Sequence, residues 1–233
     1  MVTAATDSVR EVPEHSDSGP GERWPIMNIV VFGAGGRAGR QAVAEAHRRG
    51  HQVTSVVRDP AGHSDLPGVR VVQGDVTDEV SIEHAAAGHD AVITAAVDLS
   101  VPPHDFFTMS VRALATGLGK AGVRRLVAAG LASIMPGPSG VPLMDEPGYP
   151  NEYRAFYLGH AAGLDALRSC DLDWAYVAPA GDFNHDGART GRYRIAEHGD
   201  PASRITYADF AIALVDEIET PRSRRAAVSI REA

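Results

Sequence analysis

From residue 28 onward, short apolar runs alternate with segments of helical periodicity. The apolar runs have the composition of buried strands, and we expect strands at 28–32, 51–57, 69–73, 90–95, 125–129, 172–177 and 226–230. The segments between them predict helices at 40–49, 80–87, 107–121, 153–169 and 207–218. Strands that alternate with helices form parallel sheets covered on both faces, so we predict a doubly wound, Rossmann-type α/β domain. The strand at 226–230 comes last, and we place it at an edge of the sheet.

The first 26 residues lack this alternation. Five carboxylates and two arginines are set among Ser, Pro and Gly residues, without a hydrophobic period. Such a segment cannot bury enough apolar surface to offset the entropy lost on ordering. We therefore expect a disordered acidic tail at 1–26 and a single domain at 27–233, with the substrate loops in its C-terminal half.

Composition excludes several classes of function. Lys and Arg number 22 against 30 Asp and Glu, and the net charge of −8 disfavours nucleic acid as a partner. No apolar run approaches the ~20 residues that span a bilayer, so we expect no membrane partner. The single cysteine, Cys170, and a start without a secretory signal favour a cytoplasmic protein. The ten histidines are scattered without the spacing of metal ligands, so we expect no metal.

A glycine-rich loop joins the first predicted strand to the first predicted helix. It consists of Gly33, Ala34, Gly35, Gly36, Arg37, Ala38 and Gly39. Gly33 suits a tight turn, Gly35 or Gly36 lets the backbone approach a pyrophosphate, and Gly39 lets the helix lie close to the sheet. N–H groups at the helix start would face the phosphates. The alternative is a tight turn without a ligand, but a loop between a strand and a helix predicts dinucleotide binding.

The end of the second predicted strand bears on which dinucleotide binds. A carboxylate there would favour NAD, but this strand ends at Val57 and is followed by Arg58. Arg58, helped by Arg37, could bind a 2′-phosphate through a fork of donors. Asp59 follows directly, and Arg58 could also be a solvated charge at the strand end. We predict that NADP(H) is preferred over NAD(H).

Further cofactor contacts are expected at the carboxyl ends of other strands. Asp75 and Val76 could hold the adenine edge, although Asp75 could equally be a turn or helix-capping aspartate. The small residues that follow the fourth and fifth strands could line the cofactor path, and Pro179 ends the sixth strand. These path residues are Ala95, Ala96, Val97, Ala129 and Gly130.

Several segments together resemble the atypical short-chain dehydrogenase/reductases. They are NIVVFGAGGRAG, HQVTSVVRDP, VQGDVTD and HDAVITA in the first half, and GLASIMPG, PLMDEPGYPNEY, LDALRSCDLDWAYVAPA, ARTGRYRI and SRITYADFAIALVDEIE in the second. The nearest group is the NAD(P)H-binding proteins named as NADH-flavin reductases, with biliverdin reductase B and the NmrA-like regulators as more distant relatives. The resemblance covers about residues 28–230. It implies an NAD(P)H-binding oxidoreductase that is a monomer or a homodimer.

One departure from short-chain enzymes limits the chemistry. Those enzymes pair a tyrosine with a lysine four residues later, but here Tyr157 follows Tyr153, and Ala161 follows Tyr157. Alcohol, ketone and epimerase chemistry through that pair is therefore disfavoured. Reduction of a flavin escapes this problem, because the remaining proton can come from water. We expect a small-molecule acceptor, a flavin or a similar conjugated ring; the alternative is a non-catalytic NAD(P)(H)-sensing regulator.

Three side chains are candidates for catalysis. His160 is the only histidine on the predicted helix 153–169, and Tyr153 and Ser133 are the other two candidates. His160 could instead be a surface or capped histidine. The loop at 98–105 and the Pro- and Gly-rich stretch at 134–151 are expected to form substrate walls, the latter as a lid. Phe106 is expected in the core rather than in the site.

Overall fold

A computed structural model describes residues 25–63, 66 and 69–233. All but the last two residues of the expected tail at 1–26 lie outside the described residues, so the division into tail and domain stays a prediction. The main sheet has eight strands in the order β3-β2-β1-β4-β5-β6-β10-β8. These strands are β1 (Asn28–Phe32), β2 (Gln52–Val57), β3 (Arg70–Gln73), β4 (Ala91–Thr94), β5 (Arg125–Ala129), β6 (Asp173–Pro179), β8 (Arg194–Ala196) and β10 (Ala226–Arg231). A second, two-stranded sheet pairs β7 (Asp182–Asn184) with β9 (Arg204–Thr206).

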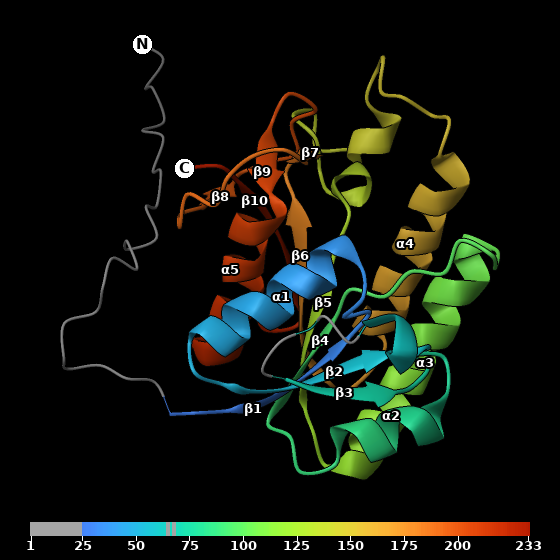
Figure 1. Cartoon of the computed structure of the whole chain (residues 1–233). Coiled ribbons are helices and arrows are strands. Elements are labelled where there is room, and N and C mark those ends of the chain that lie inside the picture. Colours follow the sequence, from blue (N-terminus) through green and yellow to red (C-terminus); the bar gives the residue numbers. More distant parts are fainter. Residues whose placement is uncertain (1–24, 64–65, 67–68) are drawn as a thin grey trace.

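Five helices cover the two faces of the main sheet (Figure 1). They are α1 (Arg37–Arg48), α2 (Glu79–Ala86), α3 (Pro103–Ala121), α4 (Arg154–Arg168) and α5 (Tyr207–Glu219). Helices α1 and α5 pack on one face, and α2, α3 and α4 pack on the other. No helix of the described chain is both long and apolar enough to cross a membrane.

The continuous apolar run of β1 is explained by burial on both faces. Ile29 and Val31 point into the core shared with α1 and α5, while Val30 and Phe32 point into the core shared with α2, α3 and α4. All four side chains are at most 1% exposed. This arrangement confirms the predicted doubly wound, Rossmann-type fold.

Two expectations about elements need correction. The strand at 226–230 is not an edge strand, because β10 pairs with β6 on one side and antiparallel with β8 on the other. The three residues of β8 are too few to show a hydrophobic period, so the sequence did not predict this edge. Helix α3 begins at Pro103 instead of residue 107, since proline suits a first helical position, where no N–H partner is needed.

An ion cluster ties α1 to α5. Arg49, at the end of α1, contacts Glu45 of the same helix and reaches Asp216 and Glu219 of α5. The Arg49 side chain is 10% exposed and the three carboxylates are 4–8% exposed. Burial alone would raise the pKa of Glu45, but hydrogen bonds and charge from Arg48 and Arg49 outweigh it and lower that pKa. The negative charges of the three carboxylates between α1 and α5 are therefore compensated by arginine.

We expect the substitution Arg49→Ala to lower the free energy of unfolding by about 3–5 kcal/mol, because removal of one partner from a buried cluster leaves uncompensated charge. Urea denaturation of the purified protein measures this change. Arg168→Ala is the matched control, since Arg168 also ends a helix but pairs with Asp165 in an exposed position. The control should cost less than about 1 kcal/mol. Equal losses in the two variants would show that burial of the cluster is not what matters.

Candidate functional site

A cavity of about 790 Å³ opens at the carboxyl ends of the central strands. Its walls come from the loops after β1, β2, β3 and β4 and from side chains of α3, α4 and α5. Strand β1 lies between β2 and β4. The strands that follow β1 in the sequence continue the sheet toward one edge as far as β3, and from β4 they continue it toward the opposite edge. Open α/β sheets bind ligands at such a switch point, and the volume lies within the range of small-molecule sites, roughly 300–1,000 Å³.

The glycine loop forms the floor of this cavity. Gly33 has φ +75°, and a Cβ there would lie 2.5 Å from the backbone nitrogen of Ala96. A Cβ on Gly39 would lie 2.1 Å from the carbonyl oxygen of Gly33. Both glycines are therefore required by the packing of the loop itself.

Gly33, Gly35 and Gly36 all line the cavity, and Gly36 differs from the other two in how much space surrounds it. A Cβ on Gly36 would touch one atom within 4 Å, the Gly33 carbonyl oxygen at 3.4 Å, so the fold has room for it. Gly36 caps α1 without a side-chain hydrogen bond, and the first turn holds no acidic residue. The positive end of the α1 dipole thus lies beside two residues without side chains, Gly35 and Gly36, and this arrangement fits the pyrophosphate of a dinucleotide.

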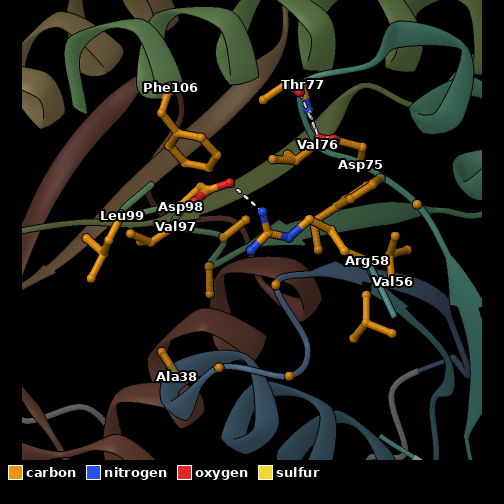
Figure 2. Close-up of a pocket in the computed structure, with 18 of the residues that line it drawn as sticks. Ala38, Val56, Arg58, Asp75, Val76, Thr77, Val97, Asp98, Leu99 and Phe106 are labelled. Atoms are coloured by element: carbon orange, nitrogen blue, oxygen red, sulfur yellow. Dashed lines mark hydrogen bonds and ion pairs between the residues drawn. The ribbon is translucent and has the colours of Figure 1, made fainter. Parts of the chain in front are cut away.

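Arg58 directly follows β2, and its side chain extends across the cavity. Its guanidinium donates to the carboxylate of Asp98 in the loop after β4, as Figure 2 shows. Arg37, the other predicted phosphate ligand, lines the same cavity and contacts Nδ1 of His185 at 3.2 Å. The structure thus brings both arginines to the cavity but gives each a protein partner.

The expected contacts after β3 and β4 also reach the cavity. Asp75 and Val76 line it on one side, and Ala95, Ala96 and Val97 line it on the other. One carboxylate oxygen of Asp75 accepts hydrogen bonds from the backbone N–H and the hydroxyl of Thr77, at 2.8 and 2.7 Å. The turn role of Asp75 is therefore present, and its position in the cavity wall leaves the adenine contact as a prediction.

Five predicted cofactor residues do not line the cavity. Ala34 is fully buried in the core, and Gly39 lies beneath the loop against Gly33. At Gly130, a Cβ would lie 2.3 Å from the Tyr176 ring, so this glycine is explained by packing. The remaining two, Ala129 and Pro179, end β5 and β6 beyond the cavity wall.

The three catalytic candidates do not meet at the cavity. His160 is buried, contacts the Tyr176 hydroxyl through Nδ1 at 3.0 Å and packs against the rings of Phe107 and Phe156. Burial lowers the pKa of His160 to about 3, so the ring is neutral. Ser133 is also buried and bonds the Tyr149 hydroxyl, while Tyr153 is 67% exposed at the start of α4. None of the three lines the described cavity, and their catalytic roles stay predictions.

The expected lid at 134–151 also contributes no residue to the cavity wall. It is held by local contacts, including an antiparallel bridge between Pro136 and Pro142 and hydrogen bonds from Ser139 to Glu146. Leu143 and Met144 anchor it in the protein interior. The length of the stretch suggested a lid, but Met135, Leu143 and Met144 are buried where they stand.

The loop at 98–105, expected as a substrate wall, contributes Asp98, Leu99 and Val101 to the cavity lining, but sequence reasoning missed the side chains of Phe106, Met109 and Phe156. Phe106 was expected in the core, and it is indeed only 5% exposed, yet its ring also lines the cavity (Figure 2). Met109 and Phe156, together with Leu99 and Val101, complete this wall. The available signal was the loop at 98–105, which leads directly into the first turns of α3.

Two further lining residues carry polar groups that sequence reasoning did not select. His63 lies against Gly35 and contacts Arg40 through Nδ1 at 3.1 Å. Tyr207, at the start of α5, stacks on Phe183 with ring centroids 4.0 Å apart. Among the described residues, no group of three or more His, Cys, Asp or Glu could hold a metal ion.

Comparison with known proteins supports a nicotinamide dinucleotide as the ligand of this family. Residues 33–221 match the model of a family described as NAD(P)H-binding. The protein YwnB of Bacillus subtilis (strain 168) is 34% identical over 208 residues, which cover 85% of this chain and 95% of YwnB.

Two solved structures are similar over their whole length. One is a "putative NADH-flavin reductase" from Streptococcus pneumoniae TIGR4, with 31% identity, a TM-score of 0.77 and coverage of 89% of this chain and 100% of that one. The other is a "putative exported protein" from Burkholderia pseudomallei, with 36% identity, a TM-score of 0.77 and coverage of 88% and 100%. The chain therefore belongs to the NAD(P)H-binding family of Rossmann-fold, oxidoreductase-like proteins, related to the atypical short-chain dehydrogenase/reductases.

Proposed function

We propose that this protein is an NADPH-dependent reductase that delivers a hydride to a flavin or to a similarly flat, conjugated acceptor. The observation that carries the proposal is that one cavity has two chemically different surfaces. The glycine loop with Arg37 and Arg58 forms the first, which we call the glycine end, and the side chains of Phe106 and Met109 belong to the second, the apolar wall.

The glycine end suits the cofactor. Gly35, Gly36 and the first turn of α1 would hold the pyrophosphate, and Arg58 would hold the 2′-phosphate. When bound, the reduced nicotinamide supplies a hydride. Ala95 and Ala96 are small, and they connect the glycine end to the apolar wall without filling the space between.

The apolar wall suits a flat, conjugated acceptor. Leu99, Met109 and Val97 line the cavity but remain 81%, 48% and 45% exposed, so a planar ring placed there would cover apolar surface that now faces water. Phe106 and Phe156 add aromatic surface. Such a wall would also exclude water from the reacting rings.

The polar groups near this wall are not those of alcohol or ketone chemistry. The cavity lining, as far as the structure describes it, contains no lysine, and its one tyrosine, Tyr207, is stacked on Phe183. A site without a tyrosine–lysine pair supports an acceptor whose remaining proton can come from water.

We expect Arg58→Ala to weaken NADPH binding by about tenfold relative to NADH binding, because only NADPH loses a charge-assisted hydrogen bond. Fluorescence titration of each reduced cofactor gives the two dissociation constants. Arg70→Ala, which removes an exposed arginine from the neighbouring strand β3 outside this cavity, is the matched control. An unchanged ratio of the two constants in Arg58→Ala would refute the proposed preference for NADPH.

We also expect purified protein to oxidise NADPH when FMN is supplied. Met109→Gln should raise the KM for FMN by about fivefold, because a polar amide replaces part of the apolar wall, while the dissociation constant of NADPH stays the same. Met109→Leu keeps the wall apolar and should retain the wild-type KM. Tight NADPH binding without oxidation would contradict the proposal and favour a non-catalytic NAD(P)(H) sensor.

A further inference from the structure

The ion pair between Arg58 and Asp98 bridges the cavity. Arg58 follows β2 directly, and Asp98 lies in the loop after β4. Because β2 and β4 flank β1, a contact between their trailing residues passes over the carboxyl end of β1, where the glycine loop begins. Figure 2 shows the Arg58 side chain directed across the opening toward Asp98.

The side chains of Asp98 and Arg58 differ in how strongly their surroundings constrain them. Asp98 is 16% exposed, and its second carboxylate oxygen accepts hydrogen bonds from the backbone N–H of Ser100 at 2.9 Å and from its hydroxyl at 2.6 Å. These bonds, followed by the charge of Arg58, lower the pKa of Asp98. Arg58 is 66% exposed, and its long side chain can move through water. Asp98 is thus the fixed partner, and Arg58 is the movable one.

We propose that Asp98 tunes cofactor affinity by holding Arg58 across the groove in the free protein. A dinucleotide that runs from the Asp75–Val76 side to the Ala95–Val97 side must open this bridge. A 2′-phosphate then gives Arg58 a new anionic partner, whereas a dinucleotide without one leaves Arg58 to water. This inference rests on the proposed role of Arg58 in cofactor binding.

A simpler effect of Asp98 must be separated from this one. A carboxylate beside the groove also repels phosphates through space, and it does so whatever residue stands at position 58. A bridge to Arg58, in contrast, disappears when Arg58 is removed. A double-mutant cycle between positions 58 and 98 distinguishes the two effects.

The experiment measures the dissociation constants of NADPH and NADH for the wild type, Asp98→Asn, Arg58→Ala and the double variant. Asparagine keeps the size of Asp98 and an oxygen that can accept from Ser100, and thermal unfolding checks that each variant is folded. We expect Asp98→Asn to tighten both cofactors by about threefold more in the presence of Arg58 than in the Arg58→Ala background, since exposed ion pairs contribute little more than this.

Asp105→Asn is the matched control, because Asp105 is an exposed carboxylate that pairs with His104 instead of Arg58. Its effect should be the same in both backgrounds. An Asp98→Asn effect that is also the same in both backgrounds would overturn the bridge and leave only repulsion. If Arg58 does not select NADPH, the result is different: the ratio of NADPH to NADH affinity is unchanged in Arg58→Ala.

Discussion

The contact between β1 and α1 depends on two residues that have no side chain. A Cβ on Gly39 would lie 2.1 Å from the Gly33 carbonyl oxygen, and a Cβ on Gly33 would lie 2.5 Å from the backbone of Ala96. These close approaches set α1 directly on the end of β1 and bring the loop after β4 beside it. The cavity at this point follows from that packing, because the helix start and the ends of the neighbouring strands are left facing one space.

Two kinds of surface meet in that space. The glycine loop and its arginines offer dipoles and positive charge, while Phe106, Met109 and Phe156 offer apolar area. The positive charge at Arg58 is balanced by Asp98 in the protein alone, so a phosphate would bind there by exchange of one anion for another. None of the three catalytic candidates lines this cavity: His160 packs against Phe156, and His160 and Ser133 make buried hydrogen bonds to Tyr176 and Tyr149.

The sequence predicted what depends on local pattern. The alternation of apolar runs and helical segments yielded the fold, and the helix expected at 207–218 is observed as α5. Contacts between distant segments could not be predicted in this way. Arg58 and Asp98 are 40 residues apart and meet only because β2 and β4 flank β1. The inner position of β10 depends on β8, whose three residues carry no pattern.

Binding of the NADPH pyrophosphate by the glycine loop is best tested at Gly36. Its substitution by alanine puts a Cβ into the cavity where the fold has room for one. The measurement is the dissociation constant of NADPH for Gly36→Ala beside the temperature of thermal unfolding. We expect an unfolding temperature close to that of the wild type and NADPH binding at least about tenfold weaker, because the new methyl group keeps the phosphates from the backbone N–H groups. Unchanged NADPH binding in a folded Gly36→Ala protein would contradict the assignment.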